Sequence, residues 1–259
     1  MTDARIAHIE NRKSKIENPP RPFLRPLLGW AFTVPSLVVA CILGLLVWPI
    51  VGGRNSFWAI APRVIRAWAA AFGIRRRMEG WEELPAEIRE GHQPAIFVGN
   101  HASIFDPPLI ISTLPCRPAF LAKQELRKLP FLGWVMGMAG FVFVDRENRT
   151  KARESLREAA HQIHEGQSIA AFPEGTRSRD GALLPFKKGV FTLAADAQVP
   201  IVPFAIRGGF EVLPKGTWRV AGVDYLIRLG KVLEASAGAD PDEVRRIAQE
   251  AVEGLLAKA

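Results

Sequence analysis

The run PAIFVGNHASIFDPP at residues 94–108 places a short apolar segment directly before a histidine and an aspartate. Its apolar part, residues 95–98, predicts a buried strand, because short apolar runs bounded by turn-forming residues are typical of such strands. The two prolines that follow Asp106 predict the first turn of a helix over residues 107–113. A strand that leads at once into a helix indicates an α/β fold with polar side chains at the end of the strand.

From about Gly80 onward, short apolar runs bounded by glycine and proline alternate with helical segments. This alternation predicts an α/β layer architecture. The predicted strands are residues 95–98, 118–122, 141–144, 168–172, 201–206 and 225–229. Helices are predicted over residues 107–113, 150–165 and 186–197, and from Asp240 onward.

The composition of the 259 residues is that of an ordinary globular protein, with 48% hydrophobic and 23% charged residues, which excludes disordered and collagen-like classes. Lysine plus arginine outnumber aspartate plus glutamate by 34 to 26, for a net charge of +8. This charge suits a polyanionic partner such as nucleic acid, anionic lipid or a phosphorylated substrate. Cys41 and Cys116 lie in unlike surroundings, so the sequence predicts neither a disulfide framework nor a cysteine-rich zinc site.

An uncharged run near the N-terminus, residues 26–53, is long enough to count as a membrane-spanning candidate. At 1.5 Å per residue it reaches about 42 Å, against about 30 Å for the hydrocarbon core of a bilayer. We expect Pro35 to interrupt the helix, which leaves residues 36–48 spanning only about 20 Å. The interruption favours a re-entrant or interfacial segment over a full crossing.

Basic residues flank the uncharged run on both sides. They are Arg5, Arg12, Lys13, Lys15, Arg21 and Arg25 before it, and Arg54, Arg63, Arg66, Arg75, Arg76 and Arg77 after it. Because such residues favour the cytoplasm, we expect the segment to enter the membrane and return. Val64, Trp68 and Phe72 then recur at helical spacing and predict an interfacial amphipathic helix. The alternative is that these three side chains pack on the domain core.

The first pair of candidate catalytic residues is His101 and Asp106. A histidine at the end of a strand is placed to act as a general base, since imidazole titrates near neutral pH. On a straight helix Asp106 would lie about 140° around from His101, so the two meet only if the chain turns, and Pro107 favours a turn there. Asp106 is also a candidate N-cap of the following helix. A metal site is disfavoured because no third ligand lies at suitable spacing.

The second candidate site is the run FPEGTRS at residues 172–178, which follows a predicted strand. Arg177 offers a planar fork suited to phosphate, Thr176 adds a hydroxyl, and Gly175 allows close approach of the backbone. We therefore expect an anion site in which Glu174 accepts a hydrogen bond from a neutral ligand hydroxyl. The alternative is a polar loop with a local ion pair.

Further basic side chains are expected to converge on the same edge of the sheet. Lys123 and Arg146 each follow a predicted strand, and open α/β sheets bind ligands at their strand ends. Lys187 and Lys188 are weaker candidates, and we expect one of them to face solvent.

Together these motifs resemble those of the glycerolipid acyltransferases. NHASIFD is similar to their histidine-x4-aspartate motif and FPEGTRS to their third motif. Residues 123–126 with 140–146 resemble the second motif, and VPIVP at 199–203 resembles the fourth. The order and spacing agree over roughly residues 80–210. The subgroup that the chain resembles most is the 1-acylglycerol-3-phosphate acyltransferases.

The resemblance implies a single mixed-sheet α/β domain with an N-terminal membrane-binding two-helix element. With the basic residues and the uncharged run near the N-terminus, it leads us to expect a basic arm (1–25), membrane-associated helices (26–78) and an acyltransferase catalytic domain (79–259). It implies a location on the cytoplasmic face of a membrane, in a bacterium the inner membrane. The implied partners are the membrane lipid surface, a lysophospholipid and an acyl-CoA or acyl carrier protein, with no nucleic acid.

The activity implied is transfer of an acyl chain from acyl-CoA or acyl carrier protein to the sn-2 hydroxyl of 1-acylglycerol 3-phosphate, giving phosphatidic acid. His101 would remove the hydroxyl proton while Asp106 holds the imidazole. No metal, no other cofactor and no acyl-enzyme on Cys116 or Ser103 is then required. The resemblance assigns the acceptor phosphate to Lys123, Arg146 and Arg177.

Other activities stay open at this point. The acceptor could be another lysophospholipid or a lyso-ornithine lipid, and a thioesterase could use the same histidine to activate water. A non-catalytic protein that binds anionic lipid would also fit the charge, but it leaves both motifs without a role.

Overall fold

In the computed structural model, which describes residues 24–146, 148–235 and 240–258, a seven-stranded sheet has the order β1-β7-β6-β2-β5-β3-β4. Neighbouring strands are parallel except β6 and β7, which are antiparallel. The strands are β1 (Arg75–Glu79), β2 (Ile96–Gly99), β3 (Ala119–Lys123), β4 (Val142–Val144), β5 (Ile169–Ala171), β6 (Ile201–Arg207) and β7 (Asp224–Leu229). The predicted mixed α/β sheet is confirmed.

The central strands lie where the sequence predicted them, because strands that are buried on both faces read as short apolar runs. All four residues of β2 and the first six of β6 are buried, as expected of strands that helices cover on both sides. The edge strand β1, with the sequence RRRME, was not predicted because it lacks an apolar run. Arg75 pairs with Asp224 of β7 at 2.6 Å. The sheet therefore begins at residue 75 and not at the expected domain boundary of 79.

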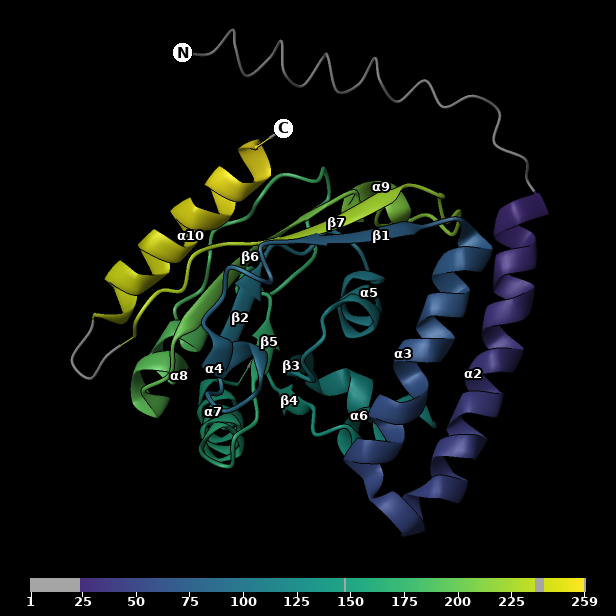
Figure 1. Ribbon diagram of the computed structural model, residues 1–259, viewed down its shortest axis with the longest axis horizontal. Helices are drawn as coiled ribbons and strands as arrows, with labels where there is room; N and C mark the ends of the chain where they lie inside the picture. The colour runs from purple at the N-terminus through teal and green to yellow at the C-terminus, as the bar shows by residue number, and fades with distance from the viewer. Residues whose placement is uncertain (1–23, 147, 236–239, 259) are drawn as a thin grey trace, which may run out of the picture.

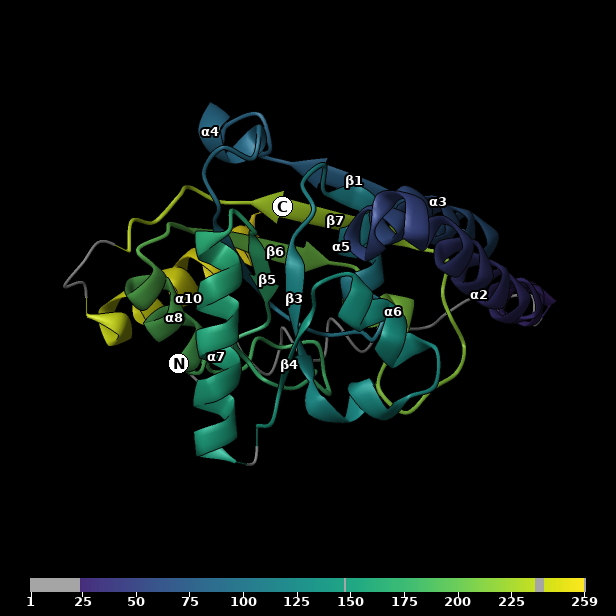
Figure 2. The same cartoon turned by 90° about the horizontal axis from the view of Figure 1, so that it is seen from below.

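Helices cover both faces of this sheet, as Figures 1 and 2 show. The helices that follow β1 are α4 (Ala86–Arg89), α5 (Asp106–Thr113), η1 (Gln124–Lys128), α6 (Leu132–Met138), α7 (Arg149–His164), α8 (Gly189–Ala197), α9 (Gly209–Val212) and α10 (Pro241–Ala257). Of these, α5, α7, α8 and α10 correspond to the predicted helices 107–113, 150–165, 186–197 and that from Asp240. Helices α7, α8 and α10 lie on one face, and α5 lies on the other, toward the N-terminal helices.

The N-terminal helices α2 (Leu24–Val51) and α3 (Gly53–Phe72) run side by side as a hairpin (Figure 1). The chain reverses at Gly52, whose φ of 79° lies in the left-handed region that glycine tolerates. The chain therefore reverses its direction directly after α2 ends, at the end of the uncharged run. The predicted basic arm, residues 1–25, lies almost wholly outside the described residues.

The expected interruption at Pro35 is wrong, because α2 continues through it. Two hydroxyls donate to backbone carbonyls in the turns around the proline. Thr33 Oγ1 bonds the carbonyl of Gly29 at 2.8 Å, and Ser36 Oγ bonds that of Thr33 at 3.0 Å. Pro35 has no N–H for the carbonyl of Ala31, four residues earlier, and neither hydroxyl bonds that carbonyl. The packing of α2 along α3 instead supports the helix through the proline.

Helix α2 presents most of its apolar surface to the exterior. In the described part of the chain it is the one helix that is long and apolar enough to cross a membrane, judged by length and composition only. Its span Pro26–Val51 has a mean hydropathy of 2.5, and only 6% of the most apolar window is buried. In α3, by contrast, Phe72 is 1% exposed and packs against Trp30 and Phe105. Core packing, and not the membrane, therefore accounts for Phe72.

Candidate active site

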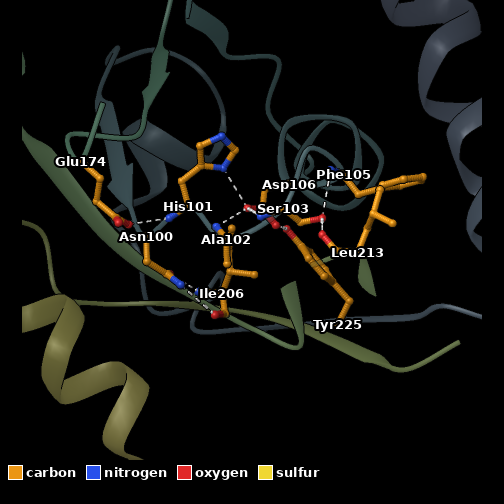
Figure 3. A network of polar contacts seen from close by, with 10 residues as sticks. All are labelled: Asn100, His101, Ala102, Ser103, Phe105, Asp106, Glu174, Ile206, Leu213 and Tyr225. Atoms are coloured by element: carbon orange, nitrogen blue, oxygen red, sulfur yellow. Dashed lines mark hydrogen bonds and ion pairs between the residues drawn. The ribbon is translucent and has the colours of Figure 1, made fainter. Parts of the chain in front are cut away.

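His101 and Asp106 meet at the carboxyl end of β2, as Figure 3 shows. His101 Nδ1 lies 2.9 Å from Asp106 Oδ2. The chain turns between β2 and α5, which brings together two residues that a straight helix would separate. The second ring nitrogen of His101 points away from Asp106 (Figure 3), and the side chain keeps 17% of its surface exposed. Within the part of the chain that the structure describes, no hydrogen bond engages this nitrogen, so it is available to exchange a proton.

Asp106 is the fully buried centre of a hydrogen-bond network. Its Oδ2 also accepts from the backbone N–H groups of Ala102 at 2.8 Å and Ser103 at 2.7 Å. Its Oδ1 accepts from the hydroxyl of Tyr225 at 3.3 Å. Helix α5 begins at Asp106 itself, and its N-cap, Phe105, makes no side-chain cap bond. The N-cap alternative for Asp106 is therefore wrong, because the carboxylate turns back toward the preceding loop.

Tyr225 lies outside the motifs that the sequence shows, and its place beside Asp106 was not predicted. Burial, and next to it the charge of Asp106, raise the pKa of the Tyr225 hydroxyl well above its ordinary value, so it remains a donor. Tyr225 is the chain's single tyrosine and occupies a buried position in the alternating pattern of β7. A buried phenol normally requires a hydrogen-bond partner, and this requirement could have pointed to it.

The FPEGTRS loop encloses His101 from several sides. The ring of Phe172 stacks on the imidazole with centroids 4.1 Å apart and planes 14° apart. The backbone N–H of Ser178 donates to the carbonyl of His101 at 2.9 Å. The backbone N–H of His101 donates to Glu174 Oε1 at 2.6 Å (Figure 3). The two motifs therefore form one site.

Glu174 has a different role from the one expected. It is 2% exposed, and its second oxygen accepts from the backbone N–H of Leu184 at 3.1 Å. Burial raises the pKa of Glu174 to about 7, against the opposing effect of its two N–H donors. Both carboxylate oxygens are thus engaged by the backbone, so Glu174 orders the loop around His101 instead of accepting from a ligand hydroxyl.

Basic side chains gather around Gly175, whose φ of 72° is left-handed. The Arg146 guanidinium donates to the carbonyl of Gly175. The Lys187 ammonium lies close as well, since a Cβ added at Gly175 would be 2.9 Å from Lys187 Nζ. Arg177 is half-buried in the same loop, next to an exposed Thr176. The arrangement leaves a positively charged rim beside the imidazole.

The two remaining basic candidates have partners of their own. Lys123 pairs with Glu125 at 3.0 Å on the surface. Lys188 pairs with Asp242 of α10 at 2.6 Å, so of the two neighbouring lysines it is Lys188 that is engaged elsewhere.

An apolar cavity of about 380 Å³ lies beside the His101–Asp106 pair. Phe105 and Pro107, the neighbours of Asp106 in the chain, line it together with residues of the α2–α3 hairpin and of α6. Val64 and Trp68 of α3 also face it. Its apolar wall suits a hydrocarbon chain.

The side chains of Cys116 and Ser103 are poorly placed to act as nucleophiles. Burial raises the pKa of the Cys116 thiol to about 12, which disfavours a reactive thiolate. Ser103 is fully buried, and its hydroxyl donates to the carbonyl of Leu213 at 3.4 Å. Within the described ranges no three His, Cys, Asp or Glu side chains are grouped as a metal site would require.

A histidine oriented by a buried aspartate, with a cationic loop packed against it, is an arrangement in which the imidazole can act as a general base for transfer or hydrolysis. A model of the family described as "Acyltransferase" matches residues 75–207, which span β1 to β6 and contain the His101–Asp106 pair and the FPEGTRS loop. The chain belongs to the acyltransferase family. The family expected from the motifs is thereby confirmed.

Named relatives agree with this assignment. The chain is 41% identical over 158 residues to a 1-acyl-sn-glycerol-3-phosphate acyltransferase of Limnanthes douglasii, a match covering 61% of this chain and 54% of the relative. It is 44% identical over 125 residues to the enzyme of that name in Haemophilus influenzae, covering 48% of this chain and 52% of the relative. The matched segment thus spans about half the length of these relatives.

A solved structure extends the likeness to the hairpin. The 1-acyl-sn-glycerophosphate (LPA) acyltransferase PlsC from Thermotoga maritima superposes with a TM-score of 0.75 at 26% identity. The alignment covers 92% of this chain and 98% of that one. The similarity therefore includes much more than the segment that contains the motifs.

Proposed function

We propose that the protein transfers an acyl chain from an acyl thioester to the free sn-2 hydroxyl of 1-acylglycerol 3-phosphate, giving phosphatidic acid. The observation that carries this proposal is the contact between His101 and the fully buried Asp106, with the other imidazole nitrogen left free. The names of the relatives support the choice of acceptor. The donor is acyl-CoA or acyl carrier protein.

The reaction proceeds by direct attack of the acceptor hydroxyl on the thioester carbonyl. His101 takes the hydroxyl proton at its free nitrogen as the new C–O bond forms, and Asp106 stabilises the imidazolium. The tetrahedral intermediate then expels the thiolate as the C–S bond breaks. The proton passes from His101 to the sulfur, so the products are an ester and a free thiol and the enzyme returns to its starting state.

The acceptor phosphate binds the cationic rim beside His101. Arg177 and Arg146 carry guanidinium groups suited to phosphate oxygens, and Lys187 adds a third positive charge at the same loop. Lys123 belongs to the same edge of the sheet and can approach once it leaves Glu125. Glu174 and Gly175 shape the loop, and Thr176 offers an exposed hydroxyl.

The hairpin holds the enzyme on one leaflet of a membrane. Its exposed apolar face on α2 suits a lipid environment, and the reversal at Gly52 returns the chain to the side from which it came. The basic flanks on both sides of the uncharged run support the proposal that this side is the cytoplasmic face. The adjoining cavity receives an acyl chain while the hydroxyl reaches His101.

The test is a panel of acceptors. Full-length protein is supplied with labelled acyl-CoA or acyl carrier protein and, separately, with lysophosphatidate, other lysophospholipids and a lyso-ornithine lipid, and products are identified by mass. Phosphatidic acid made fastest from lysophosphatidate supports the proposal. A faster product from another lyso-lipid, or free fatty acid formed without any acceptor, would overturn the acceptor assignment or the transferase assignment respectively.

A further inference from the structure

A short segment after η1 exposes an unusual amount of apolar surface. Outside α2, seven large apolar side chains of the described residues are exposed, and four of these fall within residues 129–134. They are Leu129, Phe131, Leu132 and Trp134, and we call this segment the aromatic loop. Phe131 and Trp134 are 60% and 66% exposed. Contiguous apolar surface of this kind marks a site of interaction.

The backbone of the aromatic loop is fixed in place. Phe131 has a φ of 62°, which is strained for a residue other than glycine. Gly133 packs so closely that an added Cβ would lie 2.2 Å from the carbonyl oxygen of Arg127. The rings of Phe131 and Trp134 meet edge to face with centroids 6.0 Å apart. The fold therefore holds two aromatic rings outward at a conformational cost, which suggests a purpose for their exposure.

The aromatic loop continues the apolar surface of the hairpin. Trp134 lines the same surface hollow as Leu45 and Trp48 of α2. Leu132 lines the 380 Å³ cavity that the hairpin helps to enclose. Helix α6 also lies against α3, and Figure 1 shows it beside the end of the hairpin where the chain reverses. A partner with a flat apolar surface can therefore contact the hairpin and the aromatic loop at the same time.

The charges next to the aromatic loop indicate an anionic partner. Arg127 and Lys128 precede the loop directly and are exposed. Glu154 and Glu158 line the hollow from α7, on the side formed by the catalytic domain. Aromatic rings with adjacent basic residues are characteristic of the interfacial region of membranes that contain anionic lipid.

We propose that the aromatic loop inserts into the same anionic membrane leaflet as the hairpin and forms a second membrane contact. This inference rests on the proposed function only in that the hairpin binds a membrane. The two contacts bracket the apolar cavity, since α2 and α3 line one side of it and Leu132 and Met136 the other. A lysophospholipid can then move between bilayer and cavity without its chain crossing water.

The test places a fluorescent label in the loop. Full-length protein with Cys41→Ala and Cys116→Ala receives either Trp134→Cys or, as a matched control on α10, Ile247→Cys, and each is labelled with the same dye. The proteins are bound to equimolar phosphatidylcholine and phosphatidylglycerol vesicles that contain lipids with a quencher in the acyl chain. We expect strong quenching at position 134 and none at position 247. Bound protein without quenching at position 134 would overturn the inference.

A second measurement separates this inference from the proposed function. The double variant Phe131→Asn, Trp134→Gln should bind the vesicles at least tenfold more weakly than Ile247→Gln, because two interfacial aromatic side chains are lost. Asparagine tolerates the left-handed φ at position 131. Unchanged binding would refute the loop contact even if acyl transfer occurs. Weakened binding with no acyl transfer by the unaltered protein would refute the function and leave the loop contact standing.

Discussion

The variant Asp106→Asn distinguishes the charge of this side chain from its orienting role. Two backbone N–H groups, of Ala102 and Ser103, point at Oδ2. The amide oxygen of asparagine must therefore take this position, because an NH₂ group there would face two donors. The oxygen then still accepts from His101 Nδ1, and the NH₂ group lies next to the hydroxyl of Tyr225, which can accept. We expect the histidine tautomer to be retained and only the negative charge to be lost.

The expected loss in kcat for Asp106→Asn follows from that charge. A hydrogen bond to a charged group contributes about 1.5 to 3 kcal/mol, or about 10- to 100-fold in rate. Asp106→Ala removes the acceptor altogether and should approach the loss of the general base, about 10² to 10⁴. Turnover is measured at saturating thioester and lysophosphatidate, with thermal unfolding as the control for folding. If folded Asp106→Asn is as inactive as Asp106→Ala, the orientation argument is refuted.

Three further variants test the surroundings of the pair. Tyr225→Phe should lower kcat about tenfold with little change in KM, because a donor to the carboxylate is lost; an unchanged kcat would remove Tyr225 from the network. The pKa of Glu174 is raised from 4.5 to about 7. The contribution of this side chain to the free energy of unfolding is therefore fully present below pH 4.5 and is lost as pH rises through 7. Melting temperatures should therefore fall more between pH 5 and pH 8 for the unaltered protein than for Glu174→Gln, by the equivalent of about 2.5 kcal/mol; parallel profiles would contradict the raised pKa. Arg177→Lys keeps the charge but loses the planar fork, so KM for lysophosphatidate should rise while KM for the thioester stays constant; equal changes in both would show that Arg177 does not bind the acceptor phosphate.

The sequence predicted the central sheet well because its strands are short apolar runs buried on both faces. Strand β1 escaped because an edge strand can be polar on both faces when cross-strand ion pairs, such as Arg75 with Asp224, support it. The continuity of α2 was not predicted because the rule that proline breaks helices takes no account of the packing of α2 against α3. The sequence therefore predicted two N-terminal helices but wrongly interrupted the first one at Pro35.

The site was predictable where one short motif carries the chemistry. His101 and Asp106 are five residues apart, and the proline after Asp106 already indicated the turn that joins them. The roles of Tyr225 and Glu174 depend on packing between distant segments. Tyr225 reaches Asp106 from a strand 119 residues away, and Glu174 bonds the backbone of His101 from 73 residues away. A sequence motif shows which residue types are present, but it does not show which atoms they contact in the folded protein.

The most direct test of the account compares His101→Ala with a matched exposed histidine, His161→Ala. Both folded proteins receive the same acyl thioester and lysophosphatidate, and phosphatidic acid and free thiol are measured in one reaction. We predict equal amounts of both products from His161→Ala at the unaltered rate, and a rate lower by about 10² to 10⁴ from His101→Ala. Transfer by folded His101→Ala at near the unaltered rate would contradict the claim that this histidine is the general base.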